Sequence, residues 1–321
     1  MEGSTRAGTQ ALTLLSAPIV VHTLEALADG SQSLIALRQG AGSPPQTTMR
    51  AHLRTLTETD VVVRRRQSAF PGSLDFELTG PGRDLWALAG VLRTWLAASP
   101  EGPIELGSST AKSVIRALVE GWNTNMVRAL AVRPFSLTEL DSVISGVSYP
   151  SLERRLGGMR MAGQIAKAAG PGRGTPYAVT EWLRRAVGPI AAASRWERLA
   201  VPQETTPSSR LDVEAAFLLA IPLLTLPAEL SGSCRLAVEV GPASGEQMAG
   251  VVVSIEAGRP VACSARLGGE ADAWASGSSH CWMQAVIDRE ADRLEIGGDC
   301  DLARALLDGL HDELFGVRKC G

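Results

Sequence analysis

The N-terminal segment of the chain has apolar side chains at roughly helical spacing between residues 11 and 28, which predicts one helix with a single buried face. The apolar positions are Leu12, Leu15, Ile19, Leu24 and Leu27. Asp29-Gly30 ends this run, and a short helix is expected over residues 33–38. Ser43 and Pro44 then predict the cap and first turn of a third helix.

This third helix has two faces of opposite character. Met49, Leu53 and Leu56 form the apolar face. The outward face holds side chains suited to a DNA major groove, because Arg can donate two bonds to guanine, Gln can pair with adenine, and Thr can reach a phosphate or a thymine methyl group. The outward residues are Gln46, Thr47, Arg50 and Arg54.

Two strands over residues 61–66 and 74–78, joined by a Pro-Gly turn, follow the third helix and predict a β-hairpin. A hairpin at this place is a wing, the element that flanks the recognition helix in winged helix-turn-helix proteins. Arg64, Arg65 and Arg66 lie where alternate side chains can meet the sugar-phosphate backbone. A solvated strand edge is the alternative interpretation of these three arginines.

The same pattern returns 103 residues later, over about residues 111–199. Six apolar pairs match at this offset: Leu34 with Leu137, Leu37 with Leu140, Met49 with Leu152, Leu53 with Leu156, Leu56 with Met159, and Val62 with Ile165. Agreement at one offset indicates an internal repeat. In the second copy the residues expected to contact DNA are Ser151, Arg154, Arg155, Lys167 and Arg173.

Two features of the second copy qualify this reading. Gly157-Gly158 inside its third helix costs about 1 kcal/mol of helix stability per glycine. The glycine-spaced segment 170–174 resembles a nucleotide loop, but it lacks the Lys-Ser/Thr pair of a phosphate loop. We therefore interpret this segment as the tip of a second wing.

Two motifs of the first copy have a counterpart in a known family: Leu53-x-x-Leu56-x-x-x-x-Val61-Val62 and Phe76-Glu77-Leu78-Thr79-x-x-Gly82-x-x-Leu85. With the order of elements over residues 10–98, they resemble the HxlR-type branch of winged-helix transcription regulators, which are relatives of the MarR group. The resemblance implies a long helix over residues 82–98. No cysteine precedes residue 234, so the cysteine-based redox sensing of some members is not expected here.

Regulators of this family usually pair two identical chains, so that two recognition helices meet successive major grooves. A chain with two copies can supply both helices itself. We therefore expect a monomer with a pseudo-two-fold arrangement of its tandem domains, and homodimerisation through the long helices stays open.

A polar, proline-containing linker over residues 201–209 precedes a third region of different character. A helix over 212–221, antiparallel strands over 235–240, 247–256 and 259–267, and two further helices predict an α+β domain. The expected division is 1–100 and 101–200 for two winged helix-turn-helix domains, and 208–321 for the third domain. The whole chain is thus an α+β multidomain protein.

The end of the third region carries four short motifs: Ala271-Asp272-Ala273-Trp274, Trp282-Met283-Gln284-Ala285-Val286, Leu294-Glu295-Ile296-Gly297-Gly298-Asp299, and Leu302-Ala303-x-x-Leu306-Leu307-x-x-Leu310. They resemble the sterol carrier protein type 2 fold, in which a sheet and helices enclose an apolar tunnel. The resemblance implies a pocket for an apolar or aromatic small molecule. Its expected lining is Phe217, Met248, Trp274, Trp282 and Met283, with plain core packing as the alternative role of each.

Charge separates the three parts of the chain. The formal charge is +1 over residues 1–100, +5 over 101–200 and −9 over 201–321. The first two parts suit contact with phosphate, whereas the acidic third part does not.

Several other classes are not expected. The polar N-terminus predicts no signal peptide and hence a cytoplasmic protein, and the apolar run 215–226 is too short and proline-broken to cross a membrane. The five cysteines form no CxxC pair, and the acidic residues near the C-terminus do not follow calcium-loop spacing. His280 beside Cys281 has no partner carboxylate of the right context, so we expect no enzyme, metal or cofactor.

These expectations combine into one function. The chain is expected to be a ligand-responsive transcriptional regulator whose partners are a double-stranded DNA operator and an apolar or aromatic effector. The alternative is a small-molecule binding or sequestration protein whose winged helices serve as protein-interaction modules.

Overall fold

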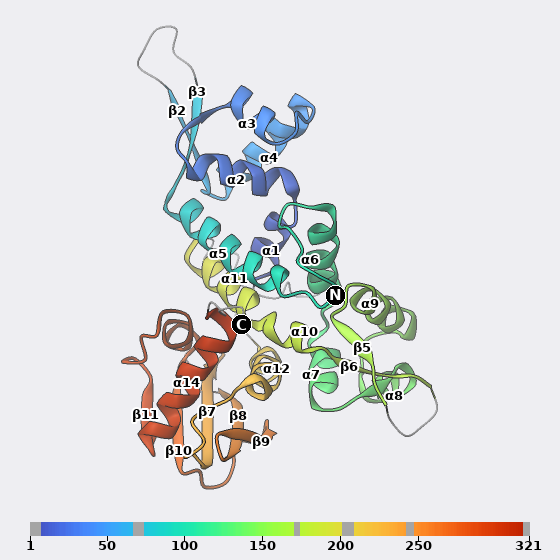
Figure 1. Cartoon of the computed structure of the whole chain (residues 1–321), viewed down its shortest axis with the longest axis vertical. Helices are drawn as coiled ribbons and strands as arrows, with labels where there is room; N and C mark the ends of the chain where they lie inside the picture. Colours follow the sequence, from blue (N-terminus) through green and yellow to red (C-terminus); the bar gives the residue numbers. More distant parts are fainter. Residues whose placement is uncertain (1–7, 67–73, 170–173, 201–208, 242–246, 317–321) are drawn as a thin grey trace. The chain divides into compact units, whose positions relative to one another are not determined.

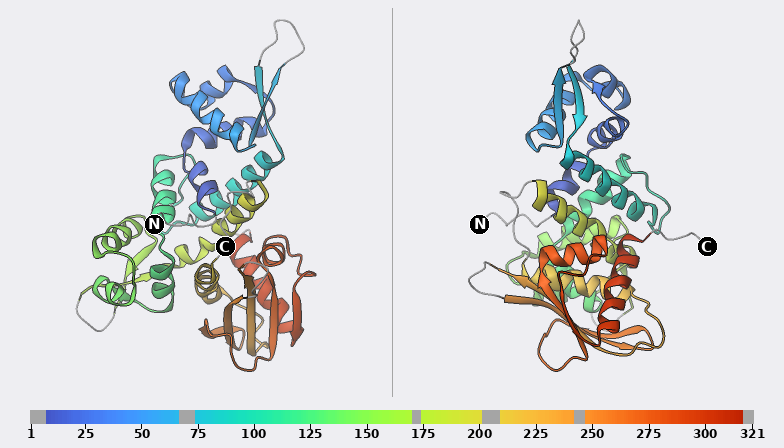
Figure 2. Two further views of the ribbon diagram at one scale, coloured as in Figure 1. Left: turned by 180° about the vertical axis from the view of Figure 1, so that it is seen from behind. Right: turned by 90° about the vertical axis from the view of Figure 1, so that its left-hand side faces the viewer.

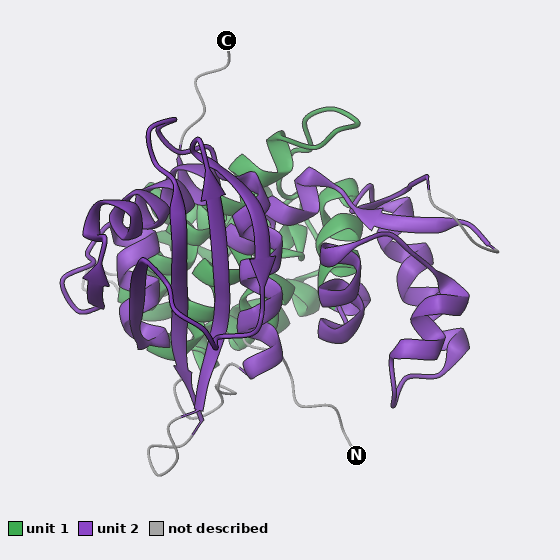
Figure 3. Ribbon diagram, turned by 90° about the horizontal axis from the view of Figure 1, so that it is seen from below, with its two compact units in different colours: residues 1–119, 189–206 green, residues 120–188, 207–321 purple. Residues whose placement is uncertain are grey.

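The computed structural model describes residues 8–66, 74–169, 174–200, 209–241 and 247–316. The chain is an α+β protein with small antiparallel sheets and a mixed C-terminal sheet, as Figure 1 shows. Its residues divide into two compact units, coloured in Figure 3. Unit 1 comprises residues 1–119 and 189–206, and unit 2 comprises residues 120–188 and 207–321. The division into three domains at residues 100 and 208 stays a prediction.

Unit 1 begins with short helices followed by a hairpin. Its elements are α1 (Thr9–Leu15), α2 (Pro18–Ala28), β1 (Gln32–Ser33), α3 (Leu34–Gly40), α4 (Gln46–Glu58), β2 (Val62–Arg66), β3 (Leu74–Leu78) and α5 (Gly80–Ala97). The strands pair antiparallel in the order β1-β3-β2. β3 packs against α2 and β2 against α4, and both views of Figure 2 show the hairpin beside these helices.

The predicted helices of this part need two corrections. The single helix predicted over residues 11–28 is divided into α1 and α2, which are bent by 83° relative to each other, because Pro18 begins a new helix. Ser33 caps α3, because its hydroxyl accepts a bond from the Ala36 amide at 3.2 Å. The predicted cap of the next helix is wrong: α4 begins at Gln46 after Pro45, with no side-chain cap. Ser43 instead has a φ of 57° and lies in the turn before the helix. Sequence alone does not distinguish a turn serine from a capping serine two residues away.

The elements of unit 1 recur at the offset of 103 residues. β4 (Phe135–Ser136), α8 (Leu137–Val143) and α9 (Tyr149–Met161) have the bounds of β1, α3 and α4 shifted by 103. α7 (Thr124–Val132), β5 (Ile165–Lys167) and β6 (Pro176–Val179) complete the set, and the strands pair in the order β4-β6-β5. Each set thus contains helices followed by an antiparallel wing-like hairpin.

In both copies a threonine hydroxyl connects the base of the hairpin to the start of the next helix. The Thr79 hydroxyl caps α5 through the Gly82 amide and donates to the Asp60 carbonyl, with the Val61 carbonyl 3.2 Å away. Thr180 repeats the arrangement, capping α10 (Glu181–Arg185) through the Leu183 amide, with its hydroxyl 3.1 Å from the Gly163 carbonyl. A motif that looks like a helix cap therefore also closes the base of the hairpin.

The copies differ in their flanking helices. α5 is continuous, whereas the corresponding stretch of the second copy is divided into α10 and α11 (Val187–Ala200). α6 (Ser109–Gly121) precedes α7, and most of α6 and α11 belongs to unit 1. There the buried Glu197 carboxylate accepts bonds from the Gly8 and Ala11 amides at the start of α1. A carboxylate at a helix N-terminus satisfies amides that have no partner within the helix.

The five strands described in the C-terminal part form one mixed sheet in the order β11-β10-β7-β8-β9. They are β7 (Gly232–Val240), β8 (Gln247–Glu256), β9 (Arg259–Ser264), β10 (Ala273–Ser278) and β11 (Glu295–Gly298). β10 runs parallel to β7 and the other pairs are antiparallel. The predicted antiparallel arrangement is therefore confirmed for β7, β8 and β9, whereas β9 ends at Ser264 rather than Leu267 and β10 lies outside the predicted strands.

Helices accompany this sheet within unit 2. They are α12 (Arg210–Ala220), the 3-10 turn Ile221–Leu223, α13 (Ser279–Met283), a π-helical turn Gln284–Asp288, and α14 (Cys300–Phe315). Alternate residues of β7 and β8 are buried, among them Leu236, Val238, Val251 and Val253. The Asp299 carboxylate caps α14 by accepting from the Asp301 and Leu302 amides, directly after β11.

No single helix in the described ranges is long and apolar enough to cross a membrane, and the one pair that passes together, α1 with α2, is bent by 83°.

Candidate nucleic-acid interface

The polar face of α4 is exposed as a continuous stripe. Met49, Leu53 and Leu56 are at most 1% exposed and hold the helix to the core. On the solvent side Gln46, Arg50 and Arg54 follow one another at intervals of four residues, and Thr47 lies beside them; all four side chains are exposed. Intervals of four place side chains one above another on a helix, so the four predicted DNA-contacting residues of this copy share one surface.

The three arginines of β2 are exposed but differ in their surroundings. The Arg65 Nε lies 2.5 Å from the Glu77 carboxylate, so its charge is compensated. The Arg64 guanidinium lies 5.9 Å from the centre of the Phe76 ring, and Arg66 makes no ion pair with a carboxylate of the described residues. Successive residues of a strand point to opposite faces, so Arg64 and Arg66 share a face that Arg65 does not. The hairpin tip lies outside the described residues.

The corresponding stripe of α9 has a different chemistry. The offset of 103 places Tyr149, Glu153 and Gly157 where α4 has Gln46, Arg50 and Arg54. Tyr149 and Glu153 are exposed. The second copy therefore presents an aromatic ring and a carboxylate at the positions where the first presents an amide and a guanidinium.

The predicted DNA-contacting residues of the second copy differ in their surroundings. Arg154 on α9 and Lys167 on β5 are exposed, and Ser151 is half-buried. Arg155 instead turns back, and its guanidinium donates to the carbonyls of Glu120 at 2.5 Å and Trp122 at 3.2 Å, at the end of α6. A positive charge at the C-terminus of a helix interacts favourably with the helix dipole. Arg173 lies outside the described residues.

The repeat already indicates that Arg155 does not belong to the outward face, because it corresponds to the half-buried His52 rather than to an outward residue.

A buried carboxylate joins the second copy to the C-terminal sheet domain within unit 2. The Glu214 side chain on α12 is 2% exposed and lies 2.8 Å from Arg128 of α7 and 2.8 Å from Arg210. The Thr124 hydroxyl donates to the Asp212 carboxylate at 2.7 Å. α12 thus packs on α7 through charged and polar contacts that the sequence pattern does not predict, because the partners are far apart in the chain.

A second arginine links the same elements. The Arg184 guanidinium donates to the carbonyls of Ala131 on α7 at 3.2 Å and Leu218 on α12 at 3.0 Å. Its burial lowers the pKa of the guanidinium. The bonded carbonyls compensate part of the cost of removing this charge from water.

The predicted ligand-binding residues lie on different elements and differ in burial. Phe217 and Trp282 are buried together, with ring centres 5.2 Å apart in an edge-to-face arrangement, and the Trp282 indole donates to the Ala237 carbonyl at 2.8 Å. Trp274 is 38% exposed and lies on Gly297 of the neighbouring strand. Met248 and Met283 are half-buried. That these five residues line one pocket stays a prediction.

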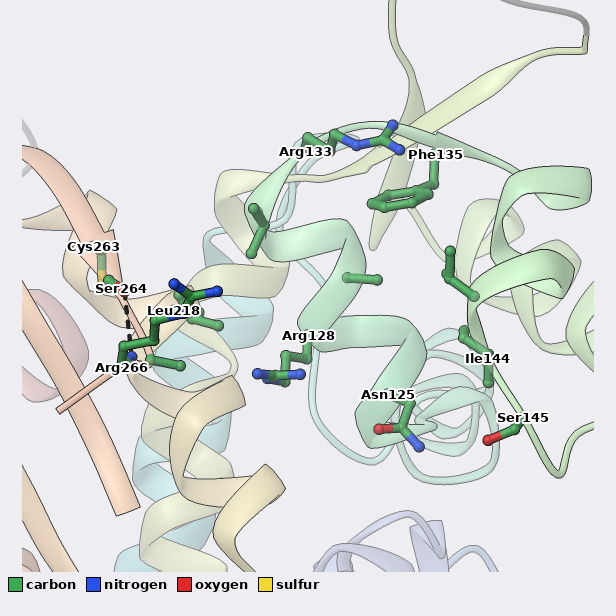
Figure 4. Close-up of a pocket in the computed structure, with 14 residues that line it drawn as sticks. Asn125, Arg128, Arg133, Phe135, Ile144, Ser145, Leu218, Cys263, Ser264 and Arg266 are labelled. Carbon is green, nitrogen blue, oxygen red and sulfur yellow. Dashed lines mark hydrogen bonds between the residues drawn. The ribbon is translucent and has the colours of Figure 1, made fainter. Parts of the chain in front are cut away.

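A cavity of about 560 Å³ lies elsewhere in unit 2, between α7, the end of α8, α12 and the end of β9 (Figure 4). Phe217, Met248, Trp274, Trp282 and Met283, all of which the structure describes, do not line it. Its walls come from residues 125–135, residues 143–145, Leu218 and residues 263–266. Because these four segments are separate from one another in the chain, no local sequence motif indicates the cavity.

Two cysteine thiols of the C-terminal part have a raised pKa. Burial raises the pKa of the Cys263 thiol to about 12, and burial with the nearby Asp299 raises that of Cys234 to about 12. No disulfide joins the four cysteines of the described ranges. In the same ranges, no group of three or more His, Cys, Asp or Glu side chains is placed to hold a metal ion.

Comparison of the chain with known proteins gave no match, either to a protein-family model or to a curated protein sequence.

Proposed function

We propose that the protein is a ligand-responsive DNA-binding transcriptional regulator with two winged helix-turn-helix modules and a sterol-carrier-like C-terminal domain. The observation that carries the proposal is the exposed stripe of Gln46, Arg50 and Arg54 on α4. Amide and guanidinium groups at successive helical turns match the donor and acceptor pattern of purine edges in a major groove. The hairpin arginines beside this helix suit phosphate contacts that fix the position of the helix.

The two modules contribute unequally in this proposal. α4 reads bases, whereas α9 presents Tyr149 and Glu153 at the equivalent positions. Arg154, Arg160 and Lys167 are exposed on the second module, so its main contribution is sequence-independent attraction to the phosphate backbone.

The C-terminal domain is suited to control rather than to DNA contact. Its part of the sequence carries a formal charge of −9, which repels phosphate. Its helix α12 is bound to α7 of the second module through Glu214. A ligand that favours one arrangement of these elements must change the DNA affinity by the same free energy.

The test is binding of a library of double-stranded DNA by the full chain at several salt concentrations, followed by selection of a preferred sequence. We expect affinity to fall steeply as salt rises. Arg50→Ala or Arg54→Ala should cost about 1–3 kcal/mol and relax the preference at one base position. Arg93→Ala is the control, because this arginine stacks on Trp86 within α5, at 4.0 Å from the ring centre. Unchanged affinity in both α4 variants would contradict the assignment of α4.

Tyr149 and Glu153 favour a second candidate, in which the α9 surface binds a protein and the chain sequesters a small molecule. This candidate expects ligand binding that is almost indifferent to salt and no selection of a DNA sequence. The same titration therefore separates the two.

A further inference from the structure

We propose that the cavity between the second module and the C-terminal sheet binds a small organic anion, namely a carboxylate with an apolar body. All the lining residues belong to unit 2. The volume of about 560 Å³ falls within the range of about 300–1,000 Å³ that is typical of small-molecule sites. The role of this ligand as an effector of DNA binding rests on the proposed function, whereas its binding does not.

The charge at the cavity is positive. Arg266, in the connection after β9, makes no ion pair with a carboxylate of the described residues. Arg128 shares the single Glu214 carboxylate with Arg210, which leaves one positive charge uncompensated in this group. Figure 4 shows the side chains of Arg128 and Arg266 extending into the space between α7 and the end of β9. Two guanidinium groups that face one space favour an anion between them.

An unused donor supports the same conclusion. The Nε of Arg128 is buried and has no hydrogen-bond acceptor among the described residues. A buried donor without an acceptor destabilises the folded chain. This atom is closed to solvent in the structure, so a carboxylate in the cavity accepts from it only after the Arg128 side chain turns, and its two oxygens can then accept from the guanidinium side by side.

An apolar part of the remaining wall extends toward α8. Leu218, Val132 and Ile144 contribute to it, together with the ring of Phe135. The third arginine of the site, Arg133, lies over this ring at 3.6 Å and is paired with Glu139 at 3.2 Å, so its charge is compensated. The arrangement therefore separates an anion-binding end near Arg266 from an apolar end near Ile144, which fits a ligand with one charged group.

The position of the apolar end indicates how ligand binding reaches α9, the counterpart of α4 in the second module. Residues 143–145 form the end of α8, and α9 begins four residues later at Tyr149. A ligand that contacts Leu218 of α12 and Ile144 at once holds α8 to the C-terminal domain. The orientation of α9 is then restrained, because α8 packs against α9.

The test is calorimetric titration of the full chain with straight-chain carboxylates from hexanoate to tetradecanoate and with 4-phenylbutyrate, each beside its neutral alcohol. We expect one site per chain and at least about tenfold weaker binding of the alcohol, since hydrogen bonds to charged groups contribute about 1.5–3 kcal/mol. Arg266→Gln should weaken carboxylate binding at least about tenfold. Arg259→Gln, an exposed arginine of β9 outside the cavity, is the matched control and should change the affinity less than about twofold.

A second pair of variants tests the apolar end. Ser145→Trp introduces a ring from an exposed position of the wall and should block binding, whereas Ser142→Trp, on the exposed side of α8 and outside the cavity, should not. Circular dichroism checks that all four variants are folded. No binding across the series, or equal binding by the Arg266→Gln and wild-type chains, would overturn the proposal.

Parallel measurement of duplex binding by fluorescence anisotropy distinguishes this inference from the proposed function. Duplex binding without carboxylate binding overturns the inference alone. Carboxylate binding that depends on Arg266, without duplex binding, supports the inference and overturns the proposed function.

Discussion

The guanidinium group of Arg128 on α7 lies 2.8 Å from the carboxylate of Glu214 on α12, and the Glu214 side chain is 2% exposed. The second partner of this carboxylate, Arg210, is 60% exposed. The pair therefore joins a helix of the second module to the first helix of the C-terminal domain at a place where water is largely excluded from the carboxylate.

Replacement of Arg128 by Met should destabilise the chain by about 1–3 kcal/mol, because the buried Glu214 then loses the partner that faces it. Urea denaturation followed by tryptophan fluorescence measures the loss. Arg210→Met is the control and should cost less than about 1 kcal/mol, since an exposed arginine in an ion pair contributes little. Equal losses in the two variants would contradict the view that Arg128 is the main partner.

The unequal arginines of β2 give a second prediction. Arg66→Gln should reduce the slope of log affinity for duplex DNA against log salt by about 1, because an uncompensated cation is removed from the hairpin. Arg65→Gln should change the slope less, since its guanidinium is paired with Glu77. A larger effect at Arg65 than at Arg66 would indicate that the opposite face of the hairpin meets the DNA.

The start of α8 gives a prediction on pH. The amide and hydroxyl of Ser136 and the nearby Arg133 lower the pKa of the Glu139 carboxyl in the folded chain. A carboxyl whose pKa is lowered on folding contributes stability above its unfolded value and loses it as pH falls through the folded value. Wild type should therefore exceed Glu139→Gln in unfolding free energy at pH 7, and the difference should shrink below about pH 4.5.

Ser136→Ala tests the other half of this capping box. It should cost about 1 kcal/mol at pH 7 and less below about pH 4.5, because the hydroxyl also stabilises the ionised Glu139 carboxylate. Urea denaturation from pH 3 to pH 8 compares the two variants. A difference for Glu139→Gln that does not depend on pH would show that the carboxylate stabilises α8 through packing alone.

Local patterns predicted the elements of the repeat, because helical spacing and capping residues act within a few positions of the chain. The first and last residues of α8 and α9 lie 103 positions after those of α3 and α4. The sequence did not predict β10, whose residues Ala-Trp-Ala-Ser-Gly-Ser are too small and too few to give a clear strand pattern. Its parallel pairing with β7 depends on a crossover of the chain that no local signal specifies.

The exposed surface of α4 and the cavity beside Arg266 also differ in how well the sequence predicts them. Gln46, Arg50 and Arg54 lie on one helix, so spacing alone placed them on one surface. The cavity beside Arg266 combines α7, α8, α12 and the end of β9, so its lining could be found only after the chain had folded. Aromatic and methionine residues were a poor guide to it, because in this domain Phe217 and Trp282 serve the core.

The final prediction concerns Gly82, whose amide is bonded to the Thr79 hydroxyl at the base of the hairpin. A Cβ at Gly82 would lie 2.1 Å from the Val61 carbonyl oxygen, which belongs to the backbone at the base of the hairpin. Gly82→Ala should therefore destabilise the chain by more than about 2 kcal/mol, since the start of α5 must move away from β2. Gly90→Ala is the matched control, because Gly90 lies in the same helix and a Cβ there meets no atom within 4 Å. It should stabilise the chain by about 0.5–1 kcal/mol. Thermal unfolding measures both changes, and a neutral Gly82→Ala variant would mean that the hairpin and α5 are not in close contact.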